Sequence, residues 1–239
     1  MSADAMTKEK APGYKDRLKD FAHGVLDPLV SGIAAVGLRP NHLTVLGLVF
    51  SLGAGLAFSM GRFRTGAVIT CLAGVCDILD GQLARKTNTI TRFGAFFDSA
   101  LDRIADAALL LGFAFFYLFN LVDMAVNPQR VLLNLQNGLE PQTWAIISVL
   151  AMLAVVGCFM VSYTRARAEG LGLDCKVGWF ERPERIVLII IMGFAGLGPV
   201  IPAGLLILVA LTFTTAFQRM AHVYRLTRHR DPDSDNTEA

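Results

Sequence analysis

The chain has 239 residues, of which 54% are hydrophobic and only 18% are charged, and its formal net charge is +2. Soluble globular domains average about 25% charged residues, so this composition argues against a soluble domain. The apolar residues collect in runs close to the roughly 20 residues that cross a bilayer, which predicts an all-α integral membrane protein. Its expected surroundings are the lipid bilayer, and no nucleic-acid partner is expected.

The segment before the first apolar run is predicted to lie on the membrane surface. Residues 1–13 form a polar tail, whereas residues 14–36 mix charges with apolar side chains. Several of these apolar side chains recur near one face at helical spacing: Leu18, Phe21, Val25 and Leu26. This pattern is typical of an amphipathic helix in the membrane interface.

Six transmembrane helices are predicted after this interfacial helix, at about residues 42–60, 65–79, 93–121, 143–163, 186–197 and 199–218. The second is expected to continue as a polar helical extension. The fifth is short for a span, so we expect it to begin earlier, near Arg182, or to tilt less than the others. Residues 14–227 are therefore predicted to form one membrane domain, followed by a disordered polar tail at residues 228–239.

The basic residues predict the orientation of these helices. Most of the 22 Lys and Arg residues lie before the first span, after the second, after the fourth and at the C-terminal end. Because cytoplasmic loops carry an excess of Lys and Arg, we expect a multi-pass protein of the cell membrane with both termini in the cytoplasm.

Carboxylates gather where the second and third spans meet the cytoplasmic side, at Asp77, Asp80, Asp98, Asp102 and Asp106. Spacings of three and four residues place them on one face of each helix. Each carboxylate near the bilayer interior costs roughly 2.5–3.5 kcal/mol, and bound divalent cations would offset this cost and the mutual repulsion. Four carboxylates can hold two such ions, which suit phosphoryl transfer. The alternative is a structural network with nearby arginines: Arg85, Arg92 and Arg103.

The string Asp77-x2-Asp80-Gly81-x2-Ala84-Arg85-x8-Gly94-x3-Asp98-x3-Asp102 resembles the signature of the CDP-alcohol phosphotransferases at every fixed position. The resemblance covers most of the chain, because this family also has six spans and an N-terminal interfacial helix. It implies an enzyme that transfers a phosphatidyl group from CDP-diacylglycerol to an alcohol by direct, metal-assisted attack and releases CMP.

The resemblance also implies roles for individual residues. Four aspartates look like ligands of two Mg²⁺ or Mn²⁺ ions: Asp77, Asp80, Asp98 and Asp102. Asp102 also looks like the general base for the acceptor hydroxyl. The residues that resemble CDP-lipid contacts are Asn41, Thr44, Gly81, Ala84, Arg85, Thr91 and Gly94. Asp106 lies outside the signature and is expected to form an ion pair, with Arg103 within reach.

A second basic cluster bears on the acceptor alcohol. Residues 162–170 and 181–185 resemble strings in the family's bacterial phosphatidylinositol phosphate synthases and their archaeal counterparts. This implies 1D-myo-inositol 3-phosphate as acceptor, with its phosphate bound by arginines at Arg165, Arg167, Arg185 and Arg219. The alternative is cytoplasmic anchoring, with Arg182 and Arg185 paired to Glu181 and Glu184.

Three competing interpretations stay open. The first is the same reaction with glycerol 3-phosphate or another alcohol as acceptor. A membrane prenyltransferase is more remote, because its aspartate motifs normally occur twice in the chain. A divalent cation carrier would need carboxylates near the midplane of the bilayer. The family resemblance further suggests a homodimer, with Ser51 and Gly55 as small residues that allow close contact between helices.

Overall fold

The structure is a computed structural model that describes residues 28–127 and 141–228, and all regular secondary structure in these ranges is helical. A short helix at residues 28–35 precedes six longer ones: α2 (Pro40–Ser59), α3 (Phe63–Lys86), α4 (Arg92–Val126), α6 (Pro141–Gly170), α7 (Arg182–Ala195) and α8 (Val200–Arg228). The predicted all-α class is confirmed. The predicted polar tail, residues 14–27 of the predicted interfacial helix and residues 229–239 lie outside the described residues.

The helix ends follow from local chemistry. Pro40 occupies the first position of α2, where its missing N–H is not needed. Thr91 precedes α4, and its hydroxyl oxygen accepts a hydrogen bond from the backbone N–H of Gly94 at 2.9 Å, which caps the helix. Gly61 and Gly196, with φ of 75° and 72°, follow the ends of α2 and α7. In these left-handed conformations glycine carries no Cβ penalty.

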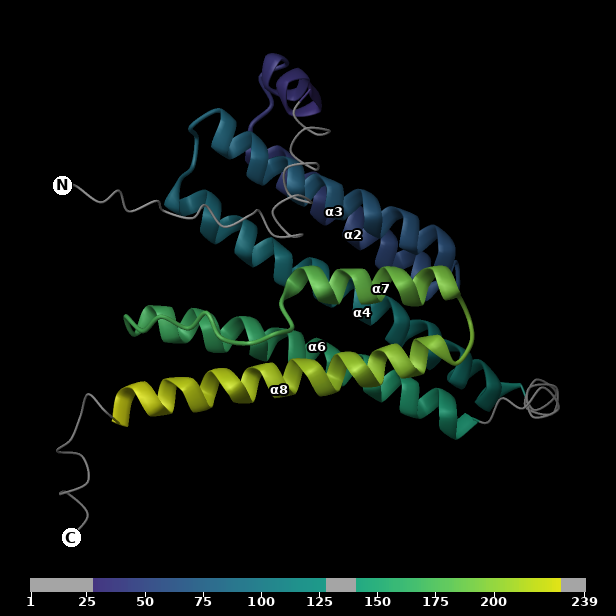
Figure 1. Cartoon of the computed structure of the whole chain (residues 1–239). Helices are drawn as coiled ribbons and strands as arrows, with labels where there is room; N and C mark the ends of the chain where they lie inside the picture. The colour runs from purple at the N-terminus through teal and green to yellow at the C-terminus, as the bar shows by residue number, and fades with distance from the viewer. Residues whose placement is uncertain (1–27, 128–140, 229–239) are drawn as a thin grey trace, which may run out of the picture.

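The six long helices form a ring in which each packs against two neighbours, in the order α2, α3, α7, α8, α6 and α4. In Figure 1, α2 and α3 lie together, α6 and α8 form a second group, and α4 runs obliquely from the first group to the second. The connection between α3 and α4 lies at the same end of the ring as the C-terminal ends of α6 and α8, on the left of Figure 1. This end carries the polar extension of α3 and the basic end of α6.

The opposite end of the ring is closed by stacked aromatic rings. Phe58 at the end of α2 lies 4.4 Å from Phe113 of α4 between ring centroids, and Phe63 of α3 lies 5.9 Å from Phe113. Offset stacking at such distances adds to the gain from burial. The aromatic cluster therefore fixes α2, α3 and α4 against one another far from the aspartates.

Five helices are long and apolar enough to cross a membrane, namely α2, α3, α4, α6 and α8. Helix α7 has 14 residues and is about 21 Å long, which is short of the roughly 30 Å hydrocarbon core. It begins at Arg182, as expected from the sequence. The chain is thus a multi-pass membrane protein, but the count of six full spans does not match the described helices.

Gly55 of α2 lets this helix approach α4 closely. A Cβ on Gly55 would lie 2.3 Å from the carbonyl oxygen of Ala108, and one on Gly112 would lie 2.4 Å from the carbonyl oxygen of Gly55. Ser51, one turn earlier, is also buried inside the chain. Gly55 therefore allows close contact between helices, as expected, but this contact lies within the chain, since both Ser51 and Gly55 face its interior.

We expect Gly55→Ala to destabilise the fold by about 1–3 kcal/mol, the usual cost of overpacking, because the new methyl group would overlap backbone atoms of α4. Gly53, on the same helix, has open space where a Cβ would stand. Gly53→Ala is therefore the matched control and should be neutral or slightly stabilising, because alanine favours a helix interior over glycine by about 1 kcal/mol. Thermal unfolding in detergent measures both, and equal midpoints for the two variants would contradict the close approach.

Candidate active site

The aspartates of α3 and α4 converge at the polar end of the ring. Asp77 lies in α3, and Asp98 and Asp102 lie one turn apart in α4. One carboxylate oxygen from each of these three residues lies within 4.8 Å of the others. Oδ1 of Asp98 is buried and has no hydrogen-bond partner. Three close carboxylates with an unpaired buried oxygen fit a hard divalent cation, since Mg²⁺, Mn²⁺ and Ca²⁺ prefer oxygen ligands.

Asp80, the fourth predicted ligand, stands apart from this group of three. It is buried, and its Oδ2 accepts a hydrogen bond from the hydroxyl of Thr44 at 2.7 Å. This bond joins α2 to α3. Asp80 and Asp98 line the same cavity, so Asp80 is a neighbour of the group and lies on its α2 side.

A cavity of about 210 Å³ lies on that side of the aspartates. All seven residues predicted to contact a CDP-lipid line it: Asn41, Thr44, Gly81, Ala84, Arg85, Thr91 and Gly94. We call it the small-residue cavity, because glycine and alanine form much of its wall. A Cβ on Gly94 would lie 3.0 Å from Oγ1 of Thr91 and 3.6 Å from Oδ1 of Asn41, so a side chain at this position would crowd the helix cap.

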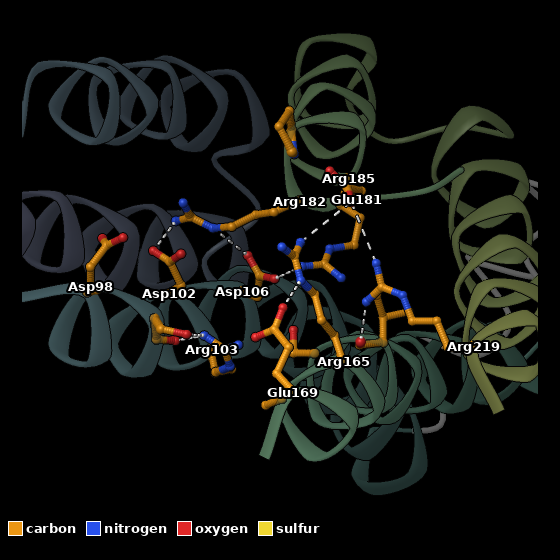
Figure 2. A pocket seen from close by; sticks show the side chains of 16 residues that line it. Asp98, Asp102, Arg103, Asp106, Arg165, Glu169, Glu181, Arg182, Arg185 and Arg219 are labelled. Carbon is orange, nitrogen blue, oxygen red and sulfur yellow. Dashed lines mark hydrogen bonds and ion pairs between the residues drawn. The ribbon is translucent and has the colours of Figure 1, made fainter. Parts of the chain in front are cut away.

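A larger cavity of about 400 Å³ lies on the other side of the aspartates, and Figure 2 shows it from close by. We call it the arginine cavity, because arginines from four helices line it: Arg103, Arg165, Arg182, Arg185 and Arg219. Asp98, Asp102 and Asp106 contribute to its wall. Asp98 and Ala95 line both cavities, so the aspartate group lies between them.

Three of the four arginines predicted to bind phosphate meet in this cavity. Arg165 donates to Oε1 of Glu169 at 2.9 Å. Arg185 is buried and donates to Oδ2 of Asp106 at 2.8 Å, while its buried Nε and Nη1 have no hydrogen-bond partner. Arg167, the fourth, is exposed on α6 and does not line the cavity.

Arg219 forms hydrogen bonds mainly with backbone carbonyl oxygens. It is buried, and it donates to the carbonyl oxygens of Val177 at 2.8 Å and Val161 at 2.5 Å. These bonds tie α8 to α6 and to the connection that leads into α7. Arg219 therefore shapes the cavity wall and keeps only Nη2 toward the cavity, 3.6 Å from Glu181.

Arg182 is the site residue that the sequence did not single out. Its Nη1 lies 2.7 Å from Oδ1 of Asp77, its Nη2 lies 2.9 Å from Oδ1 of Asp102, and its Nε lies 3.6 Å from Oδ1 of Asp106. Burial by itself would lower the pKa of Arg182, but the three carboxylates raise it, so the guanidinium stays charged. The available signal was its spacing of three residues from Arg185 at the start of α7.

Asp106 forms ion pairs, as expected, but with different partners. It pairs with Arg185 and Arg182 of α7. Arg103, the expected partner, instead donates from Nη1 to the backbone oxygen and hydroxyl of Ser99. The suggested pairing of Arg182 and Arg185 with Glu181 and Glu184 is not seen among the ion pairs of the described residues.

Comparison with known proteins gives a consistent result. The family model described as CDP-alcohol phosphatidyltransferase matches residues 38–216. The chain is 34% identical to archaetidylinositol phosphate synthase of Methanothermobacter thermautotrophicus over 84% of this chain and 89% of that protein. It is 32% identical to phosphatidylinositol phosphate synthase of Mycobacterium marinum over 84% of this chain and 80% of that one.

Solved structures show the same likeness. The structure of phosphatidylinositol phosphate synthase from Mycobacterium tuberculosis with CDP-DAG bound superposes with a TM-score of 0.68 and 29% identity, over 82% of this chain and 92% of that one. A second structure of that enzyme, in complex with manganese and citrate, also gives a TM-score of 0.68, over 82% of this chain and 88% of that one.

Proposed function

The chain belongs to the CDP-alcohol phosphatidyltransferase family, and we propose that it transfers the phosphatidyl group of CDP-diacylglycerol to 1D-myo-inositol 3-phosphate. The products would be phosphatidylinositol phosphate and CMP. One observation carries this proposal, namely the position of the aspartate group between the small-residue cavity and the arginine cavity. The family membership leaves no support for the prenyltransferase and cation-carrier interpretations.

The small-residue cavity suits the CDP end of the lipid. Gly81 and Ala84 leave room along α3 for a ligand close to the helix backbone, and Arg85 in the same wall can pair with phosphate. Asn41 and Thr91 add polar side chains on the α2 and α4 sides. The bilayer-embedded helices around the cavity would hold the diacylglycerol chains.

The arginine cavity suits a doubly charged acceptor. Arg165 and the partnerless nitrogens of Arg185 present donors to a volume of about 400 Å³. Arginine forks match phosphate oxygens in geometry and charge. A neutral acceptor such as free inositol would leave the buried Nε and Nη1 of Arg185 without an anionic partner, which is costly for donors of a charged group. We therefore propose that the acceptor carries a phosphate.

The reaction would take place between the two cavities. We propose that Asp77, Asp80, Asp98 and Asp102 hold two divalent cations, Mg²⁺ or Mn²⁺. When bound, these ions would neutralise the pyrophosphate and stabilise the CMP leaving group. Asp102 lines the arginine cavity and would take the proton of the acceptor hydroxyl. The hydroxyl oxygen then bonds to the phosphorus of the phosphatidyl group, and the bond from that phosphorus to the oxygen of CMP breaks.

We propose that this site faces the cytoplasm in the cell membrane, with both termini on the same side. The support is the basic residues at the active-site end of the ring, including Arg165, Arg167 and Arg225, because cytoplasmic flanks are rich in Lys and Arg. A homodimer stays a prediction of the family resemblance.

A CMP-release assay on the detergent-solubilised full chain tests the proposed function. With CDP-diacylglycerol and Mg²⁺ or Mn²⁺, we expect CMP only when inositol 3-phosphate is added, and no release when EDTA removes the metal. CMP release with glycerol 3-phosphate but not with inositol phosphate would show that the proposed reaction is right and the proposed acceptor is wrong. Absence of release with every acceptor would refute the transferase assignment.

The two cavities predict opposite kinetic effects for two arginines. Arg165→Gln should raise KM for inositol phosphate about tenfold or more and leave KM for CDP-diacylglycerol nearly unchanged, because a hydrogen bond to a charged group is worth about 1.5–3 kcal/mol. Arg85→Gln should do the reverse. Arg167→Gln is the matched control, because this exposed arginine lies only two residues after Arg165 but does not line the cavity. Equal effects of the Arg165 and Arg85 variants on both KM values would contradict the division into two cavities.

A further inference from the structure

Two adjacent residues at the start of α7 point in different directions and meet groups of opposite charge, as Figure 2 shows. Arg182 reaches toward the aspartates and pairs with Asp77 at 2.7 Å and Asp102 at 2.9 Å. Glu181 reaches toward the arginines, where its Oε1 lies 3.7 Å from Nη1 of Arg165 and 3.6 Å from Nη2 of Arg219.

Arg182 occupies the place where a cation would bind. Asp77 and Asp102 are two of the three residues whose oxygens converge on a common point, and the guanidinium takes one oxygen from each. Without a positive charge between them, these carboxylates would repel each other in a partly buried site. The guanidinium therefore stabilises the aspartate group in the absence of a metal ion.

Glu181 occupies the place in the arginine cavity where an anion would bind. Its carboxylate lies between Arg165 and Arg219 at distances that allow Coulomb attraction but not tight hydrogen bonds. The side chain is about half exposed, at 49%, so a ligand in the cavity can reach it. A phosphate oxygen bound to both arginines would take this position.

We infer, on the basis of the proposed function, that the first turn of α7 supplies an internal counter-ion for each half of the site. Asp77 and Asp102 can bind a divalent cation only after they release Arg182, and Arg165 and Arg219 can bind an acceptor phosphate only after they release Glu181. Arg182 and Glu181 are thus positioning residues that set the affinity for metal and for acceptor.

The two exchanges are coupled through the arginine cavity. Arg182 lines this cavity together with Arg165, Arg185 and Arg219, so a guanidinium released by the aspartates adds its charge beside the phosphate position. Bound Mn²⁺ should therefore tighten the binding of phosphate, and phosphate should tighten the binding of Mn²⁺ by the same factor.

Binding of Mn²⁺ to the full chain without substrate tests the role of Arg182, with free Mn²⁺ measured by electron paramagnetic resonance. We expect Arg182→Gln to bind Mn²⁺ about tenfold more tightly than the unchanged protein, because a competing charged contact worth about 1.5 kcal/mol or more is removed. Arg103→Gln is the matched control, since Arg103 lies in the same cavity but bonds to Ser99. An equal gain in Mn²⁺ affinity in both variants would mean that the loss of any nearby positive charge explains the effect, and it would overturn the inference.

A second variant keeps the test valid if Arg182→Gln does not fold, as judged by thermal unfolding. Arg182→Lys provides a point charge instead of a fork, so it should pair with only one carboxylate and bind Mn²⁺ more tightly than the unchanged protein. An affinity equal to that of the unchanged protein would count against the exchange. If none of the proteins binds Mn²⁺, the metal centre of the proposed function fails together with the inference. If the unchanged protein and the Arg182 variants bind Mn²⁺ with equal affinity, the metal centre stands and only the inference fails.

Inorganic phosphate tests the role of Glu181. In calorimetric titration of the full chain, we expect Glu181→Gln to bind phosphate several-fold more tightly than the unchanged protein. Asp174→Asn is the matched control, because this exposed carboxylate pairs with Lys176 and lies outside the arginine cavity. Unchanged phosphate affinity in Glu181→Gln, or an equal gain in Asp174→Asn, would overturn the role of Glu181.

Discussion

Asp102→Asn is expected to lower the rate of CMP release by at least about 10³-fold. A general base alone contributes about 10²–10⁴-fold to such a reaction, and the same substitution removes a charged oxygen from the group of three carboxylates. The side chain keeps its size, so the cavity keeps its shape. Initial rates with saturating CDP-diacylglycerol and inositol phosphate measure the effect on kcat.

Asp123→Asn provides the control for this substitution. Asp123 lies on the same helix, α4, but near its other end, where its carboxylate accepts from Asn127 at 2.9 Å. This variant should keep nearly full activity. If Asp102→Asn retains more than about a tenth of the activity, Asp102 is not the general base. Loss of a general base should lower the rate by about 10²-fold or more.

The aspartate group could be predicted from the sequence because its geometry is mostly local. Spacings of three and four residues fix which side chains share a helix face, and the short connection between α3 and α4 brings their aspartate-bearing parts to the same end of the ring. The position of Asp80 could not be predicted in this way. Its contact with Thr44 depends on how α2 packs against α3, which the spacing within α3 does not determine.

The arginines show the limit of the same reasoning. Arg165 and Arg167 are two residues apart on α6, so they cannot point in the same direction, but the sequence does not say which one faces the aspartates. Arg182 reaches Asp77 of α3 because α7 packs against that helix, and Arg185 reaches Asp106 of α4 across the ring. Both aspartates lie more than seventy residues earlier in the chain. A positive cluster at a helix end looks like membrane anchoring until that packing is known.

The predicted count of six spans is inexact for a related reason. The apolar run at residues 186–197 resembles a short membrane helix, but α7 begins with charged residues that belong to the active site: Arg182 and Arg185. Local hydropathy shows neither where such a helix packs among the others nor which of its residues face the active site. Similarly, Gly55 is a small residue that favours close helix contact, and only the fold shows that its neighbour is α4 of the same chain.

The buried pair of Asp106 and Arg185 is expected to dominate the stability of this end of the ring. The two side chains are 7% and 4% exposed and join at 2.8 Å. Asp106→Leu or Arg185→Met alone should destabilise the fold by about 3–5 kcal/mol. Asp106→Leu leaves Arg185 without its carboxylate, and Arg185→Met leaves Asp106 with only the longer, 3.6 Å contact to Arg182. Thermal unfolding in detergent measures this loss, and Asp174→Asn, which opens an exposed pair, should shift the midpoint little because such pairs contribute about 0–1 kcal/mol.

The double variant Asp106→Leu/Arg185→Met separates the structural role of Arg185 from its role in binding. Replacing a buried ion pair by apolar residues of similar size is often neutral for stability, so the double variant should unfold near the midpoint of the unchanged protein. It should still show a raised KM for inositol phosphate, because the partnerless Nε and Nη1 of Arg185 have been removed from the cavity. A stable double variant with unchanged KM would make Arg185 a structural partner of Asp106 only, and acceptor binding would then depend on Arg165 and on the Arg182 that the aspartates release.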